Sequence, residues 1–218
     1  YGICRTAREL LMGGDLVGRV IARPFVGEPG AYVRTEHRRD FALPPEEDTV
    51  LNAIANAGMD VVGVGKIEDI FCRSGITQTD HTTNNHDGIE AAVRYAADRS
   101  IRGLVFVNLV DFDMLYGHRD DPVGYKNALE YFDKNLPRVL SAMGKEDLLI
   151  LTADHGCDPC FPGTDHTREY IPILAYSPAR AGGEDLGTRT SFADIAATAA
   201  AWLGVPWHTG TPFFAPPN

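Results

Sequence analysis

From Glu46 onward the sequence alternates between two kinds of pattern. Helical periodicity covers residues 47–57, 88–98, 125–143 and 192–203, and short apolar runs cover residues 60–65, 103–110, 148–152 and 171–176. A strand that is apolar throughout is buried on both faces, as in parallel sheets whose crossover helices cover both sides. We therefore predict an α/β fold with a mostly parallel sheet and helices on both faces.

Capping and breaking residues set the expected helix boundaries. The last helix is predicted to follow the N-cap residue Ser191 and to end at Gly204. Pro137 falls inside the third helix, where it should cause a kink.

His81 and His86 flank a polar loop, and an acid at Asp87 is typical of a helix start. We therefore interpret this loop as a helix cap rather than a catalytic segment.

The first 42 residues follow a different pattern. A helical segment over residues 3–12 precedes an apolar segment over residues 18–26, which predicts a strand closed by turn-forming glycine and proline. Residues 31–48 are polar and contain two consecutive prolines. We predict a separate lobe at 1–42 and an α/β domain at 43–218. The chain starts at Tyr1, without methionine and without an N-cap, so we expect it to be part of a longer protein.

Composition argues against several classes of function. The net charge of −10 over 218 residues disfavours nucleic acid or anionic membrane as a partner, although a local basic patch could hold a small phosphorylated substrate. No apolar run approaches the ~20 residues of a membrane span, and no signal peptide is recognisable, so we expect a cytoplasmic protein. The four cysteines are too few for a disulfide framework, and Cys157 and Cys160 are interpreted as incidental loop residues.

Acidic and imidazole side chains follow two of the predicted strands. Asp113 and His118 come after the run at 103–110, Asp154 and His155 come after the run at 148–152, and His166 lies eleven residues beyond His155. Ligands of open α/β sheets bind outside the carboxyl ends of the strands, where these side chains should meet. Five donors exceed one tetrahedral site and suit two adjacent metals. Imidazole with carboxylate favours manganese, zinc or iron over calcium or magnesium.

Two further aspartates lie beside these donors. If the strand conformation continues, Asp111 shares a face with Asp113, and Asp165 directly precedes His166. A carboxylate often orients a ligating imidazole by hydrogen bonding. We therefore expect Asp111 and Asp165 to support ligands or the local structure rather than bind metal themselves.

Four segments together resemble one known family. They are Asn-Leu-Val-Asp-Phe-Asp-x-x-Tyr-Gly-His at 108–118, Thr-Ala-Asp-His-Gly at 152–156, Pro-Gly-Thr-Asp-His-Thr-Arg-Glu-Tyr at 162–170 and Gly-Arg-Val-Ile-Ala-Arg-Pro-Phe-Val-Gly-Glu-Pro-Gly at 18–30. The sequence resembles phosphopentomutase, of the alkaline phosphatase superfamily, over nearly its whole length. The resemblance implies an incomplete alkaline phosphatase-like core and part of a small α+β cap domain.

The resemblance also implies site residues and a reaction. Asp113, His118 and His166 would bind one manganese ion, and Asp154 and His155 would bind the other. Substrate-binding positions correspond to Arg19, Ile21, Arg34 and Lys66. The family interconverts ribose 1-phosphate and ribose 5-phosphate, or their deoxy forms, through a phosphothreonine on the enzyme.

The chain departs from the family pattern at its start. The nucleophilic threonine and one further metal-binding aspartate belong to an N-terminal segment, and neither Thr152 nor Thr167 matches the nucleophile. We therefore expect a sugar-phosphate substrate, the missing N-terminal part as a partner, and no mutase activity from the isolated chain. The alternatives are a related metal-dependent phosphatase or cofactor-independent phosphoglycerate mutase, and a non-catalytic metal-binding fragment.

Overall fold

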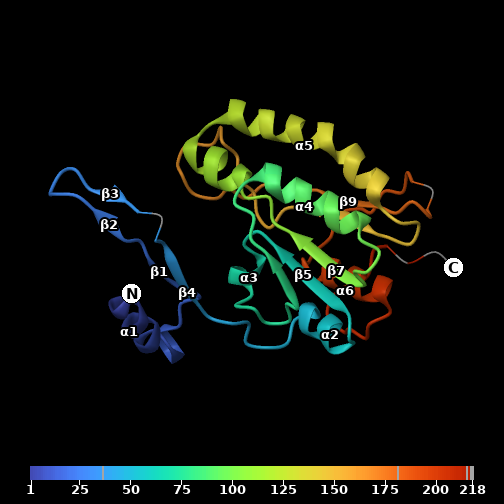
Figure 1. Cartoon of the computed structure of the whole chain (residues 1–218), viewed down its shortest axis with the longest axis horizontal. Helices are drawn as coiled ribbons and strands as arrows, with labels where there is room; N and C mark the ends of the chain where they lie inside the picture. Colours follow the sequence, from blue (N-terminus) through green and yellow to red (C-terminus); the bar gives the residue numbers. More distant parts are fainter. Residues whose placement is uncertain (36, 181, 215, 217–218) are drawn as a thin grey trace.

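The computed structural model describes residues 1–35, 37–180, 182–214 and 216. It places an α/β unit beside a smaller amino-terminal lobe, which lies on the side where the parallel strands end (Figure 1). The predicted α/β fold is therefore confirmed. The division at residues 42 and 43 stays a prediction.

Three parallel strands form the centre of the α/β unit. The order is β6 (Gln78–Asp80), β5 (Asp60–Val64) and β7 (Gly103–Val107). The central strand β5 is apolar on both faces, as its continuous pattern predicts. Val61 packs with Leu51 and Ile54 on one side, whereas Val62 and Val64 pack with Ala91 on the other.

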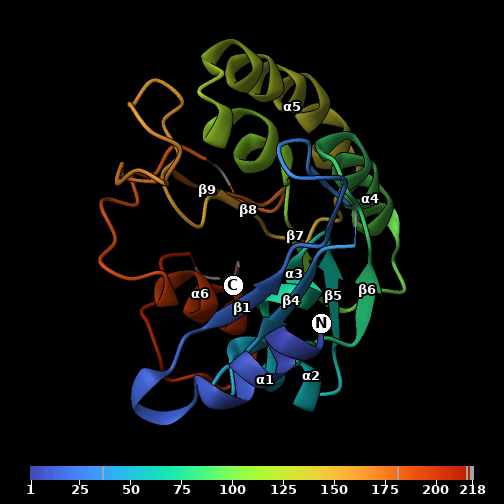
Figure 2. The ribbon, with the colours of Figure 1, turned by 90° about the vertical axis from the view of Figure 1, so that its left-hand side faces the viewer.

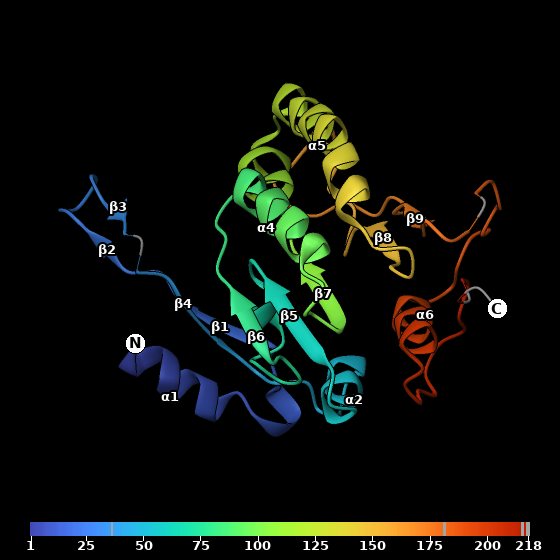
Figure 3. The same cartoon turned by 45° about the vertical axis from the view of Figure 1, so that its right-hand side comes forward.

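Helices cover both faces of this sheet (Figures 1 and 3). One face carries α4 (Asn85–Ala97) and α5 (Pro122–Ala142), and the other carries α2 (Val50–Asn56) and α6 (Ala193–Leu203). The longest helix, α5, contains Pro137. Among the described residues, none of the helices combines the length and the apolar composition that a membrane-spanning helix needs.

The last two strands pair with each other. β8 (Leu149–Thr152) and β9 (Ile173–Tyr176) are antiparallel and form a ladder separate from β6-β5-β7. The expectation of strands here is confirmed, but their pairing is not parallel. A segment of about twenty residues joins them, and the isolated bridge Gly156↔Thr167 folds that segment back on itself.

Side-chain caps fix where the helices begin. The Asn84 side chain accepts a hydrogen bond from the Asp87 backbone N–H, so α4 starts three residues before the predicted Gly88 and Asp87 lies in its first turn. For α6 the N-cap is Phe192 rather than Ser191, although the Ser191 hydroxyl accepts from the Ala193 N–H. Gly204 ends α6 with a φ of 69°, as predicted.

The amino-terminal lobe is built from α1 (Gly2–Leu10), a 3₁₀ turn η1 (Gly13–Asp15) and two antiparallel ladders. β1 (Arg19–Ala22) pairs with β4 (Arg39–Ala42), and β2 (Phe25–Val26) pairs with β3 (Val33–Arg34). The single strand predicted over 18–26 is thus wrong, because the chain leaves β1 before Pro24. The two strands within the polar stretch were not predicted. Figure 2 shows β1 and β4 in front of α3 (Ile67–Ile70) and β5.

Candidate metal centre

The carboxyl end of β7 leads into two short helical turns that carry Asp113 and His118. These are the π-helical turn η2 (Phe112–Tyr116) and the 3₁₀ turn η3 (Gly117–Arg119). Single π-helical turns are rare and occur frequently at functional sites. The predicted extended continuation of the strand, with Asp111 and Asp113 on one face, is therefore wrong.

Asp111 serves the scaffold instead. Its carboxylate accepts from the Asn85 backbone N–H at 2.8 Å, and its own N–H donates to the Asn85 side-chain oxygen at 2.9 Å. This reciprocal pair joins the end of the β7 segment to the start of α4. It is the structural role that the sequence allowed for Asp111.

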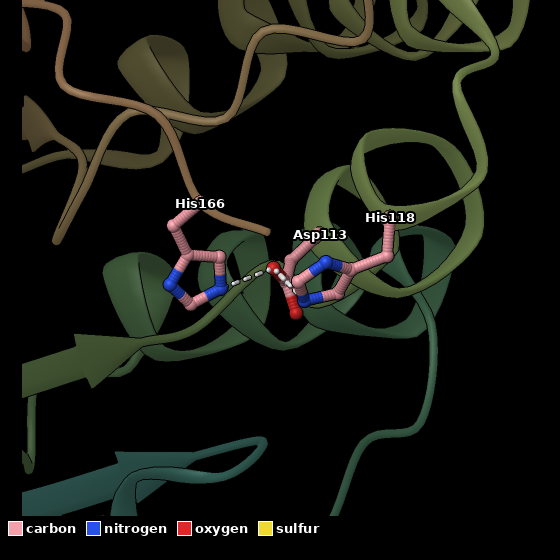
Figure 4. A group of neighbouring side chains, drawn as sticks. All are labelled: Asp113, His118 and His166. Carbon is pink, nitrogen blue, oxygen red and sulfur yellow. Dashed lines mark hydrogen bonds and ion pairs between the residues drawn. The ribbon is translucent and has the colours of Figure 1, made fainter. Parts of the chain in front are cut away.

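Asp113 lies between two imidazole rings (Figure 4). Its Oδ1 is 3.1 Å from His118 Nε2 and 3.1 Å from His166 Nε2. One donor atom from each of the three residues lies within 4.8 Å of the others. The side chains of Asp113, His118 and His166 are 34%, 37% and 47% exposed, so further ligands can reach the group.

Backbone carbonyl groups orient two of the histidines. His118 Nδ1 lies 2.5 Å from the Thr164 carbonyl oxygen, and His155 Nδ1 lies 3.0 Å from the Gly156 carbonyl oxygen. A carbonyl can only accept, so each Nδ1 carries a proton. In the neutral tautomer this leaves the lone pair at Nε2, which is how a metal-binding imidazole is usually held. The Nε2 lone pair of His118 then faces the Asp113 carboxylate, and a cation between these two acceptors would relieve their repulsion. The residues present therefore fit a bound metal.

His155 and Asp154 lie at the edge of this group. The His155 and His166 rings stack with centroids 3.6 Å apart at an angle of 15°. Asp154 Oδ1 is 3.5 Å from His155 Nε2, and the Asp154 side chain is 73% exposed. The structure thus brings the donor atoms of three of the five predicted ligands together, with His155 stacked on His166 and Asp154 largely exposed beside His155. Asp165, the proposed supporting carboxylate, is exposed in the same loop.

Gly117 allows the loop after β8 to approach the two helical turns. A Cβ atom at this position would collide with the Cys157 Sγ. Burial raises the pKa of the Cys157 thiol, and the neighbouring carboxylate of Asp113 raises it further. Cys157 is therefore a protonated packing residue, in agreement with its interpretation as a loop cysteine.

The predicted substrate-binding residues divide into two groups. Lys66 directly follows β5 and Gly65, and Arg19 and Ile21 lie on β1. Burial lowers the pKa of Lys66, as does the charge of Arg38, while Asp113 opposes the shift. Lys66 therefore lies within electrostatic reach of both the lobe and the candidate metal centre. Arg34 lies apart from these residues, on the hairpin β2–β3 that extends away from the α/β unit (Figure 1).

Sequence reasoning missed two features of the site. The carbonyl of Thr164 orients His118, but a backbone group leaves no signal in the sequence. Asp40 forms ion pairs with Arg19 and Arg38. Its position within a run of arginines was the available signal, because a lone acid there is suited to pairing.

The α/β fold and the group of metal-binding donors are typical of a metal-dependent enzyme. Comparison of the sequence with known proteins agrees. The profile of the Metalloenzyme superfamily matches residues 30–206. The chain belongs to this superfamily.

Individual relatives are similar to the chain over nearly all of its length. It is 59% identical over 215 residues to a phosphopentomutase of Anaeromyxobacter sp. (strain K), and 56% identical over 214 residues to that of Caldanaerobacter subterraneus subsp. tengcongensis. It is 51% identical over 205 residues to the phosphopentomutase of Acetivibrio thermocellus. These matches cover 99%, 98% and 94% of this chain but 55%, 54% and 53% of the relatives, so the chain spans about half their length.

Proposed function

We propose that the chain is the carboxyl-terminal part of a manganese-dependent phosphopentomutase that interconverts ribose 1-phosphate and ribose 5-phosphate, and their deoxy forms. The observation that carries the proposal is that donor atoms of Asp113, His118 and His166 lie within 4.8 Å of one another. The similarity to phosphopentomutases over 94–99% of the chain supports the same reaction.

Asp113, His118 and His166 would hold one manganese ion, and Asp154 and His155 would contribute to a second site. Two imidazoles with one carboxylate form a donor set suited to manganese. Bound metal would neutralise negative charge on the transferred phosphoryl group. The two residues Asp154 and His155 make a sparse site by themselves, which fits a further ligand from outside this chain.

Lys66 and Arg19 would bind the phosphate of the sugar at the carboxyl edge of the sheet. A guanidinium can hold two phosphate oxygens in a planar fork, and an ammonium adds a compact point charge. Ile21 would contact the sugar from the same strand as Arg19, and Arg34 would reach the substrate from the hairpin. Their roles in the reaction are to bind and orient the substrate.

The two threonines within the sequence motifs of the site, Thr152 and Thr167, already form hydrogen bonds. The Thr152 hydroxyl donates to the Pro172 carbonyl at 2.9 Å. The Thr167 hydroxyl donates to Glu169 and accepts from the Asp158 N–H. These contacts support a phosphothreonine elsewhere, in a segment preceding this chain, and predict that the 218-residue chain alone does not turn over substrate.

The test combines metal analysis with an assay of ribose 5-phosphate isomerisation. The chain would be produced alone and together with the preceding half of the Anaeromyxobacter sp. (strain K) phosphopentomutase, with Asp113→Asn as the control. We expect the chain alone to bind manganese, and we expect turnover only when the other half is added. The Asp113→Asn variant should lose both manganese binding and turnover. Turnover by the chain alone would contradict the proposal, and release of inorganic phosphate would favour a phosphatase.

A further inference from the structure

One face of the ladder β1–β4 gathers ionic side chains next to the core. Arg19 and Ile21 lie two residues apart on β1, and Asp40 pairs with Ile21 across the ladder, so the three share a face. Asp40 also lines a cleft of about 510 Å³ between β4 and α3. Strand β4 therefore borders α3, the helix that directly follows Lys66.

Asp40 binds two arginines at once. Arg38 Nε donates to Asp40 Oδ1 at 2.8 Å and Arg38 Nη2 donates to Oδ2 at 2.9 Å, a bidentate pairing that fixes the plane of the guanidinium. Arg19 Nε lies 3.6 Å from the same Oδ2. The Asp40 side chain is 20% exposed and each arginine side chain is 45% exposed. The carboxylate is thus largely enclosed, while both cations still face solvent.

The cluster brings cations and carboxylates together. Arg19 and Arg38 pair with Asp40, and both Asp40 and Asp113 lie within electrostatic reach of Lys66. Burial lowers the pKa of Lys66, and the charge of Arg38 lowers it further, so the two cations interact electrostatically. Arg38 uses two of its five N–H donors on Asp40, so the other three can point at a ligand. A guanidinium with free donors beside an ammonium group suits the oxygens of a phosphate monoester.

We propose that Arg38 is a further phosphate-binding residue and that Asp40 is a positioning residue, which holds Arg38 and Arg19 toward Lys66. The inference rests on the proposed function, because it assigns the phosphate of the sugar substrate to this cluster. Arg38 is not among the substrate positions that the family resemblance implies. The residue beside it, Arg39, belongs to a different environment, since its guanidinium lies over the rings of Tyr1 and Phe41 at 5.7 and 5.2 Å.

The experiment uses the natural polypeptide that contains this chain. Binding of inorganic phosphate is measured by calorimetry, and KM and kcat are measured with ribose 5-phosphate. Arg38→Ala should weaken phosphate binding and raise KM by about 10- to 100-fold, as expected for loss of a charged hydrogen bond. The variant kcat should change less than twofold. Arg39→Ala is the matched control and should bind phosphate like the unsubstituted protein.

Asp40 is tested through its coupling to Arg38. Asp40→Asn should weaken phosphate binding by about 10-fold, and Asp40→Glu should recover part of the loss. In the double variant with Arg38→Ala, the effects should be less than additive, because Asp40 acts through Arg38. Unchanged thermal unfolding and manganese content in the Asp40 variants would accompany a positioning role.

Two results would overturn the inference. One is phosphate binding by Arg38→Ala within twofold of the unsubstituted protein, and the other is full additivity in the double variant. The proposed function can fail separately. If the polypeptide binds inorganic phosphate through Arg38 but does not isomerise ribose 5-phosphate, the phosphate-binding cluster stands and the mutase assignment is wrong.

Discussion

Asp113 Oδ1 and His166 Nε2 lie 3.1 Å apart although 53 positions separate them in the sequence. The contact joins the turn after β7 to the loop between β8 and β9. Neither segment is regular secondary structure over its whole length, so the contact holds two loops at one point. A metal at this point would bind them together.

His166→Ala should therefore remove one imidazole ligand and weaken manganese binding. Loss of a hydrogen-bonded residue next to a metal ligand typically costs 10- to 100-fold in metal affinity. We expect loss of a ligand to cost at least about 100-fold. Calorimetric titration with manganese checks the prediction. His208→Ala, at an exposed position near the carboxyl end, should leave the affinity unchanged. Equal affinities in the two variants would exclude His166 as a ligand.

Gly117→Ala should destabilise the fold, because the added methyl group collides with Cys157 Sγ. Overpacking of this kind costs about 1–3 kcal/mol. Urea unfolding measures the loss. Adding Cys157→Ala removes the sulfur and should restore much of the stability, whereas Gly14→Ala, with open space around its Cβ, should cost less. A double variant as unstable as Gly117→Ala would assign the effect to another contact.

The parallel core was predictable because burial on both faces leaves a clear sequence signal. β5 is apolar at every position but its first and a glycine, and the structure places it between α4 and α2. β6 gave no such signal, since its three residues are polar and form an edge strand. A Thr77 hydroxyl bonded to the Val61 N–H helps to fix the chain entering β6. Strands held by polar contacts of this kind are recognised only in the folded chain.

Predictions for the site depended on strand ends. The carboxyl ends of β7 and β8 lead into the segments that carry Asp113 and His155, and each of these side chains lies against His166. The sequence could not show that the chain becomes helical after β7. Continuous apolar runs favour parallel pairing, but β8 and β9 pair antiparallel in spite of that preference. The ligand roles of Asp113, His118, Asp154, His155 and His166 stay predictions until metal binding is measured.

Asp111→Ala separates a scaffold role from a metal-supporting role. The substitution leaves the Asn85 backbone N–H without its carboxylate partner, and Asn85 is 5% exposed. An unpaired buried donor costs about 1–3 kcal/mol. We expect a lower urea midpoint but manganese affinity close to that of the unsubstituted chain, in contrast to Asp113→Ala. A loss of affinity similar to that of Asp113→Ala would instead place Asp111 in the metal centre.

Asp194 should make the stability of the chain depend on pH in the acid range. The Thr211 backbone N–H donates to Asp194 Oδ1 and Arg189 donates to Oδ2, each at 2.8 Å. The Thr211 bond, and then Arg189, lower the pKa of Asp194 below its ordinary value of 3.8. The pKa of such a carboxyl is lower in the folded chain than in the unfolded chain. It therefore stabilises the fold fully at pH values above its pKa in the unfolded chain, and this contribution is lost as the pH falls through its pKa in the folded chain.

The contribution of Asp194 should therefore be complete near pH 5 and decline below about pH 4. Urea midpoints of the unsubstituted chain and Asp194→Asn, measured between pH 7 and pH 3, check this prediction. The amide keeps an oxygen for the Thr211 N–H but loses the charge that pairs with Arg189, so the variant should be less stable at pH 7 and should approach the unsubstituted chain at pH 3. Asp185→Asn, in an exposed loop, is the control. A constant difference between Asp194→Asn and the unsubstituted chain at every pH would show that the Asp194 charge does not stabilise the fold.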